Sequence, residues 1–279
     1  MGKARKKKVP LTARSSSSVA NSSSRPESTR QVIRQYHVLL KQKSQLETSL
    51  VSKFDAQATQ KLQDVTRQID ELGGLESYQR MSVIGQGSDR GGGSEKILIA
   101  WLKESRRDAK EMVPTLRLLE VGALKPDNYA SCESWIKNTP LDLNSRHPDI
   151  LEQDFLLMDA DEHREKWDVL SLSLVLNFVS DAKDRGRMLR LAWSFLVEGG
   201  SLFLALPLPC VANSRYVDSQ YLTGLMECIG FSQQRERSRA GGKMIYLLYR
   251  KQSPVGHTAP YEKKSILRSG NRNNFCILL

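Results

Sequence analysis

The sequence predicts an α/β fold: a mostly parallel sheet with helices on both faces, a terminal antiparallel hairpin and an N-terminal helical extension. Two observations predict it. From about residue 95 onward, short apolar runs alternate with segments of helical periodicity, as in sheets whose parallel strands are joined by helices. One apolar run, 116–121, ends in an acid followed by a glycine turn, and open α/β sheets bind ligands at such strand ends.

The chain has 279 residues, enough for one sizeable domain with extensions. Shifts in composition divide it into five segments. We expect a disordered basic and Ser-rich tail (1–28), a helical extension (29–84), a Gly-rich linker (85–94), the α/β domain (95–250) and a basic C-terminal extension (251–279).

The net charge of +11 lies in the two ends of the chain. Residues 1–30 hold eight basic residues and one acid, and residues 250–279 hold six and one. Such ends suit nuclear targeting or contact with phosphates, although they also serve simply to solvate a disordered tail. No apolar run approaches the ~18 residues of a membrane helix, and the N-terminus lacks the apolar core of a secretory signal. We therefore expect a soluble, intracellular protein without a membrane partner.

The four cysteines form no CxxC pair and have no cluster of histidines near them, so we expect idle thiols and no metal site. They are Cys132, Cys210, Cys228 and Cys276.

The extension 29–72 has helical periodicity, with Ser28 or Thr29 as the expected N-cap and Gly73 and Gly74 at its end. A helix or helical hairpin packed on the domain is the preferred interpretation. A partner-binding coiled coil is the alternative, which about two heptads support poorly. Glycines in 85–94 suggest a phosphate cradle, but no strand precedes them and no GK[ST] follows, so a linker is expected.

Within the α/β domain we expect a helix over 97–103 and then alternating strands and helices. The expected strands are 117–121, 140–143, 168–176 and 201–206, the helices are 184–196 and 219–229, and the closing hairpin is 234–238 with 244–249.

The first candidate site follows the strand 116–121, where the sequence LRLLEVG places Glu120 and Gly122. A glycine here lets the backbone approach a ligand. The carboxylate of Glu120 is placed to accept hydrogen bonds or to meet a cationic ligand group. Alone the motif is weak, because the fuller G-x-G-x-x-G is absent, which also argues against a nicotinamide-dependent reductase.

Two further acids follow in order. Asp142 ends the next strand, 20 residues after Gly122, the distance expected for an acid that holds ribose hydroxyls. Asp154 is expected to accept from an adenine amino group while Phe155 packs on the ring. A cap of a turn is the alternative for each acid.

Acceptor-side candidates come from the last two parallel strands. Asn177 and Phe178 follow the strand 168–176, and the loop after 206 carries Asn213, Arg215 and Tyr216. Functional residues concentrate in such strand-end loops, so we expect substrate contact here. For Asn177, capping of the following turn is the alternative.

Four strings carry a resemblance: LEVGALKPDN (119–128), SLSLVLNFV (171–179), DRGRMLR (184–190) and PCVANSRY (209–216). They resemble the fungal 25S large-subunit rRNA adenine-N1 methyltransferase family, whose metazoan relatives include an S-adenosylmethionine sensor. The resemblance spans about 30–279. It implies a Rossmann-like class I S-adenosyl-L-methionine-dependent methyltransferase of the nucleus and nucleolus, acting in rRNA processing and ribosome biogenesis on 25S rRNA or a pre-ribosomal particle.

On this resemblance, Gly122 is the cofactor glycine and Asp142 the ribose-binding acid. Adenine N1 has an in-plane lone pair, so the reaction needs alignment more than a strong base, and Asn177 and Asn213 are the candidate catalytic residues. The base must be unpaired or flipped out to expose N1. A non-catalytic S-adenosylmethionine-sensing protein is the alternative.

The last four residues, Cys276 to Leu279, fit a prenylation pattern. A closing apolar strand is the preferred interpretation, because a lipid anchor conflicts with work in the nucleolus.

Overall fold

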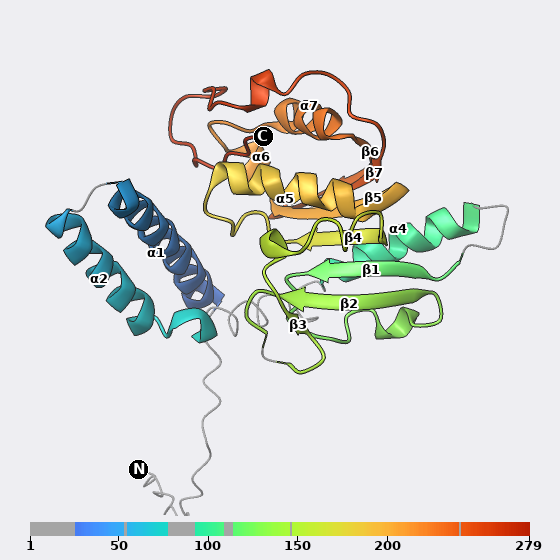
Figure 1. Cartoon of the computed structure of the whole chain (residues 1–279), viewed down its shortest axis with the longest axis horizontal. Helices are drawn as coiled ribbons and strands as arrows, with labels where there is room; N and C mark the ends of the chain where they lie inside the picture. The colour runs from blue at the N-terminus through green and yellow to red at the C-terminus, as the bar shows by residue number, and fades with distance from the viewer. Residues whose placement is uncertain (1–25, 53–54, 78–92, 109–113, 146, 240) are drawn as a thin grey trace, which may run out of the picture.

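The fold comes from a computed structural model, which describes residues 26–52, 55–77, 93–108, 114–145, 147–239 and 241–279 (Figure 1). Most of the expected disordered tail, 1–28, and of the expected linker, 85–94, lies outside the described residues; residues 26–28 are described and form the start of the first helix.

Two antiparallel helices form the N-terminal extension: α1 (Pro26–Ser52) and α2 (Ala56–Glu71). Asp55 caps α2 by accepting from the Gln57 amide at 2.8 Å. The predicted helicity is confirmed, but α1 begins at Pro26 rather than after Ser28 or Thr29. A proline fits the first helical turn, where its missing N–H is not needed.

The helices bury an apolar cluster of their own, and no member of it comes from the sheet domain. It contains Tyr36, Leu39, Val65 and Ile69, flanked by Leu40, Leu46, Leu72 and Leu75.

The domain is built on a seven-stranded sheet in the order β3-β2-β1-β4-β5-β7-β6. All neighbours pair in parallel except β7, which is antiparallel to both β5 and β6. The predicted mostly parallel sheet with an antiparallel hairpin is therefore confirmed. The strands are β1 (Leu116–Val121), β2 (Ile136–Asp142), β3 (Leu151–Glu152), β4 (Trp167–Ser173), β5 (Leu196–Pro207), β6 (Phe231–Ser238) and β7 (Met244–Lys251).

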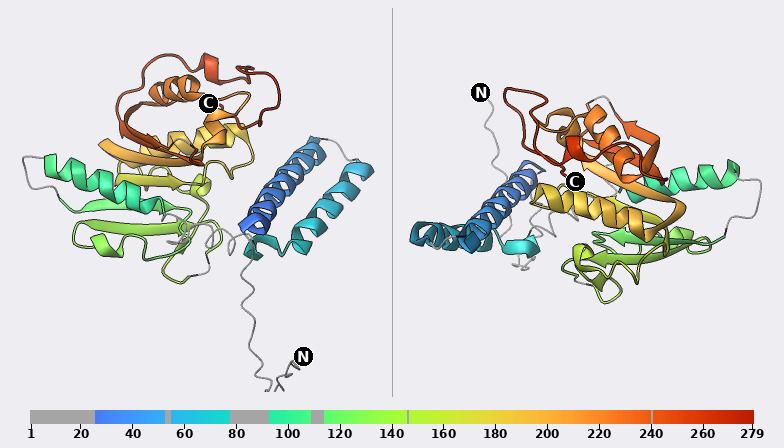
Figure 2. Two further views of the ribbon diagram at one scale, coloured as in Figure 1. Left: turned by 180° about the vertical axis from the view of Figure 1, so that it is seen from behind. Right: turned by 45° about the horizontal axis from the view of Figure 1, so that its top comes forward.

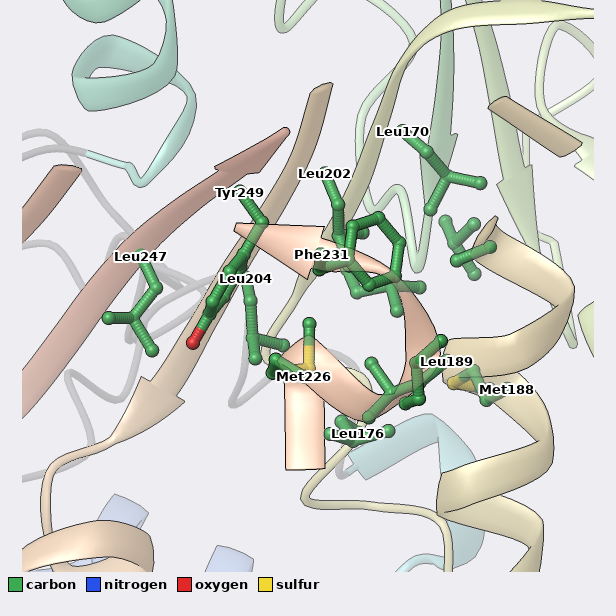
Figure 3. Close-up of a cluster of buried hydrophobic side chains, with 14 of the residues drawn as sticks. Leu170, Leu176, Met188, Leu189, Leu202, Leu204, Met226, Phe231, Leu247 and Tyr249 are labelled. Atoms are coloured by element: carbon green, nitrogen blue, oxygen red, sulfur yellow. The ribbon is translucent and has the colours of Figure 1, made fainter. Parts of the chain in front are cut away.

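Helices cover both faces of this sheet, because alternate residues of the central strands are apolar on each side. On one face α4 (Glu95–Asp108) packs through Leu98 and Trp101 against Leu118 and Phe203. On the other, a larger cluster joins the strands to α5 (Ala182–Phe195) and α7 (Ser219–Ile229), and Figure 3 shows its centre. Among the described residues, a short helix, α6 (Pro209–Ala212), and three 3₁₀ turns (Ala130–Cys132, Phe155–Leu157 and Ala259–Tyr261) complete the domain.

The observed strands differ from the predicted ones where the apolar pattern misleads. β4 ends at Ser173 and not at 176, because Leu174 adopts φ +59° and turns the chain. β2 begins at Ile136 and not at 140, because the polar residues 137–139 interrupt the apolar pattern from which the strand was predicted. β3 was not predicted, since two exposed residues carry no periodicity.

The C-terminal segment packs into the domain. Phe275 and Ile277 belong to the larger cluster, although the expected closing strand is wrong: only an isolated bridge forms, between Ser214 and Asn273. Cys276 is 2% exposed, so the residue of the prenylation pattern is buried in this fold.

Within the described part of the chain, no helix is long and apolar enough to cross a membrane, and no three His, Cys, Asp or Glu side chains gather as a metal site. All four cysteines are free thiols.

Candidate functional site

The candidate residues gather at the carboxyl edge of the sheet. Gly122 follows β1, Asp142 ends β2, Asn177 follows β4 and Asn213 follows β5 and α6. These four strands are parallel, so their carboxyl ends meet at one edge, on which open α/β sheets bind their ligands (Figure 1). Tertiary structure thus brings together residues that lie up to 91 positions apart in the sequence.

Gly122 occupies a position that requires glycine. Its φ is +77°, in the left-handed region, and its amide donates to the Leu141 carbonyl at 2.7 Å. A Cβ built on it would lie 2.5 Å from Cγ2 of Val175, in the loop after β4. The turn after β1 is therefore held against both β2 and the acceptor-side loop, and a larger residue has no room there.

Glu120 is buried behind this turn, with 7% exposure. Its two carboxylate oxygens accept from Asn128 at 2.6 Å and Asn138 at 2.8 Å. Burial raises the pKa of Glu120 to about 7, against the lowering effect of these two hydrogen bonds, and the charges of Glu95 and Asp127 add to the rise. The carboxylate thus links the segment that follows β1 with strand β2, and it stabilises the carboxyl edge of the sheet from the buried side.

Asp142 lies half-buried at the end of β2. Its Oδ1 accepts from the Asn144 amide at 2.9 Å, which fixes the carboxylate in a tight turn. Burial raises its pKa, and the neighbouring charge of Glu152 adds to this effect. The turn-capping alternative is thus realised in the structure, and the same contact orients the carboxylate.

Asp154 takes its turn-capping alternative, and Phe155 differs from expectation. The Asp154 side chain caps the 3₁₀ turn by accepting from the Leu156 amide at 2.8 Å. Phe155 is 3% exposed, and its ring meets that of Phe195 edge-to-face at 5.5 Å in the core. The expectation that Phe155 packs on an adenine ring is wrong for this structure, because the turn directs the ring inward.

Asn177 lies in the turn after β4. Its Oδ1 is buried and has no hydrogen-bond partner among the described residues. Buried polar atoms are normally satisfied, so an orphaned acceptor at a ligand-binding edge is a candidate ligand contact.

Ser94, just before α4, was missed by sequence reasoning. Its hydroxyl lies 2.5 Å from that of Ser173 at the end of β4. This bond brings the start of α4 to the same edge. No local signal pointed to it, since Ser94 falls at the end of a glycine-rich stretch that reads as a linker.

The loop after α6 is bound to the C-terminal segment. Asn213 Oδ1 accepts from Arg272 at 2.9 Å, and Arg215 donates to Asn274 at 2.8 Å and to the Gly270 carbonyl at 3.1 Å. Tyr216 packs against the small cluster around Cys276. Arg215 and Tyr216 are thus bonded to and packed on the C-terminal segment, and their expected nucleotide contacts stay a prediction.

A hollow of about 640 Å³ lies elsewhere, around the starts of strands at Arg117, Lys137 and Trp167. None of the candidate residues borders it. Two of its cations are paired internally: Arg117 contacts Asp168 at 2.9 Å, and Lys166 contacts Glu162 at 3.8 Å. The carboxyl edge, and not this hollow, holds the residues with chemistry suited to a nucleotide.

Residues 63–277 match the family model described as 25S rRNA (adenine(2142)-N(1))-methyltransferase, Bmt2. The chain is 35% identical over 218 residues to the Saccharomyces cerevisiae protein named 25S rRNA (adenine(2142)-N(1))-methyltransferase, covering 77% of this chain and 63% of that protein. It is 34% identical over 258 residues to the Schizosaccharomyces pombe 25S rRNA adenine-N(1) methyltransferase, covering 88% and 91%. The chain thus spans less than two thirds of the first relative and most of the second.

Among solved structures, a Burkholderia thailandensis 1,6-didemethyltoxoflavin-N1-methyltransferase aligns with a TM-score of 0.45 at 12% identity, covering 63% of this chain and 87% of that chain. A Catenulisporales acidiphilia 16S rRNA (adenine(1408)-N(1))-methyltransferase aligns with a TM-score of 0.37 at 10% identity, covering 56% and 92%.

Proposed function

Because this chain belongs to the family of 25S rRNA (adenine(2142)-N(1))-methyltransferases, we propose that it methylates N1 of an adenine in 25S large-subunit rRNA. The methyl donor is S-adenosyl-L-methionine, and the fold is that of a Rossmann-like class I methyltransferase. The observation that carries the proposal is the grouping of Gly122, Asp142 and Asn177 at one carboxyl edge, inside the residues that match the family.

The residues at this edge fit the cofactor. The turn at Gly122 has no room for a side chain, and Asp142 presents an oriented carboxylate suited to ribose hydroxyls. When bound, the cofactor supplies a methyl group activated on a sulfonium.

The acceptor needs alignment rather than deprotonation, because the N1 lone pair lies in the plane of the ring. Asn177 Oδ1 is suited to accept from the amino group beside N1, which would fix the direction of that lone pair. Asn213 has its Oδ1 engaged by Arg272, which directs its amide N–H groups elsewhere, suiting them to a ring nitrogen or a phosphate. The carbonyl oxygen of Asn177 also tolerates the positive charge of the product.

The names of both relatives are those of enzymes, which favours catalysis over the alternative of a cofactor sensor. The basic ends of the chain support a role on RNA, since they would add affinity that falls steeply with salt. On the same basis we propose a nuclear and nucleolar location and action on a pre-ribosomal particle during ribosome biogenesis.

The test is methyl transfer from labelled S-adenosyl-L-methionine to 25S rRNA from cells that lack the protein. We expect label in one adenine, located by reverse-transcription arrest. The rRNA from parent cells that contain the protein should take up little label, because the position is already methylated there. Asn177→Ala should lower the rate of transfer. Tight cofactor binding without transfer to free rRNA, pre-ribosomal particles or unfolded rRNA fragments would instead identify a sensor.

A further inference from the structure

The C-terminal segment 267–279 is bonded directly to one loop of the acceptor side and is linked to the other through Arg185 on α5. Figures 1 and 2 show the end of the chain beside α5, which follows one of these loops, and α6, which leads into the other. One loop, 177–180, lies after β4, and the other, 211–217, consists of the end of α6 and the residues after it. They are more than 30 residues apart in the sequence, so a shared support decides how they sit relative to one another.

Arg268 holds the second loop from inside. Its guanidinium donates four hydrogen bonds of 2.5–3.0 Å to backbone carbonyls of the loop, and its own amide donates to the Arg215 carbonyl at 3.3 Å. A planar guanidinium with five N–H donors suits this arrangement, whereas a lysine has three. The four carbonyls belong to Val211, Ala212, Ser214 and Val217.

Arg185 on α5 holds the first loop to the same segment. It is buried, and it donates to the Val179 carbonyl at 2.9 Å and to the Cys276 carbonyl at 2.5 Å. Its guanidinium also lies over the Phe275 ring, 4.7 Å from the centroid. The next residue, Gly186, has no room for a Cβ because the Leu278 carbonyl crosses the helix there.

Neither guanidinium forms an ion pair with a carboxylate in the described ranges; both are bonded to carbonyls. Such contacts fix backbone positions and leave unsatisfied carbonyls when they are removed. Arg272, in the same C-terminal segment, adds a further contact to this loop by donating a hydrogen bond to Asn213 Oδ1.

We propose that the segment 267–279 is the frame of the acceptor pocket and that Arg268 and Arg185 are positioning residues, which align the acceptor adenine through the loops 211–217 and 177–180. This inference rests on the proposed function for its catalytic consequence. The cofactor half of the edge, at Gly122 and Asp142, has no contact with this frame among the hydrogen bonds of the described residues. The frame should therefore govern transfer and not cofactor binding.

The test uses the full chain with Arg268→Gln, Arg268→Lys and Arg185→Lys, and with Arg237→Gln, on the exposed outer strand β6, as the control. We measure cofactor Kd, kcat and KM for unmodified rRNA, and the urea midpoint. For Arg268→Gln we expect kcat to fall about tenfold to a hundredfold with the cofactor Kd within about twofold of the parent, since misplaced reactants lose alignment and not affinity. Arg268→Lys should recover part of the loss, and Arg237→Gln should match the parent.

A second readout does not depend on activity. Amide hydrogen exchange should rise in 211–217 for Arg268→Gln and in 177–180 for Arg185→Lys, while β1 keeps its protection. Unchanged exchange in both loops, or a cofactor Kd that weakens in parallel with kcat, would overturn the frame. A parent protein that transfers no methyl group would refute the proposed function, and the exchange result would still decide whether the frame exists.

Discussion

Asn138 on β2 donates a 2.8 Å hydrogen bond to Oε2 of Glu120 on β1. The other carboxylate oxygen accepts from Asn128, in the segment between β1 and β2. Glu120 therefore connects three parts of the chain behind the Gly122 turn. Because burial disfavours the charged form of Glu120, the stability of these contacts depends on whether its carboxyl group is protonated.

The stability of the fold should depend on pH through Glu120. Its pKa is raised from 4.5 to about 7, so between these values the folded protein keeps a proton that the unfolded chain releases. The contribution of Glu120 to the free energy of unfolding therefore falls as pH rises from about 4.5 to about 7, by about 1–3 kcal/mol. Urea unfolding at several pH values should show a weaker fall for Glu120→Gln. Exposed Glu133→Gln should keep the parent slope, and an equal slope in all three proteins would contradict the prediction.

Replacement of Gly122 by alanine should weaken cofactor binding. The φ of +77° costs an alanine about 1–2 kcal/mol, and the added Cβ would press on Val175. Gly241→Ala is a matched control, because its φ is +71° but no atom lies within 4 Å of the added Cβ. We expect both variants to lose stability and only Gly122→Ala to lose cofactor affinity, by about tenfold or more for 1.4 kcal/mol of lost binding. Calorimetric titration with the cofactor measures this, and equal affinities in the two variants would argue against a site at this turn.

Asp142→Asn should lower cofactor affinity with little effect on folding. The amide oxygen of asparagine still accepts from the Asn144 amide, so the turn is kept. A charged acceptor for the ribose hydroxyls is lost, which costs about 1.5–3 kcal/mol and thus about tenfold to a hundredfold in Kd. The control is Asp161→Asn, whose side chain is 88% exposed. Unchanged affinity in Asp142→Asn would remove this residue from the site.

Phe155 should be important for stability and not for binding. Phe155→Ala is expected to lose about 3–5 kcal/mol of unfolding free energy, because it empties a packed core position beside Phe195. Phe155→Leu loses less and keeps the fold, so its cofactor Kd should equal that of the parent. Leu157→Ala, at a position with 73% exposure, should change neither quantity. A selective loss of affinity in Phe155→Leu would restore the role of Phe155 at the adenine.

Local patterns in the sequence were sufficient for the main elements. The helices α5 and α7 and the strands β1, β5 and β7 have continuous apolar or periodic character, so their existence and order could be predicted. The acid and glycine after β1 and the acid at the end of β2 were predictable for the same reason, since strand ends define the edge at which open sheets bind ligands.

Sequence by itself thus determined the fold class, the family resemblance and the positions of Gly122 and Asp142. Only the tertiary structure decided that Phe155 points into the core, that Ser94 meets Ser173, and that the C-terminal segment is bonded to the loop 211–217. The physical reason is the range of the interactions. Periodicity records contacts within a few residues, whereas the bonds of Arg268 to the loop 211–217 join groups more than 50 positions apart and leave no local pattern.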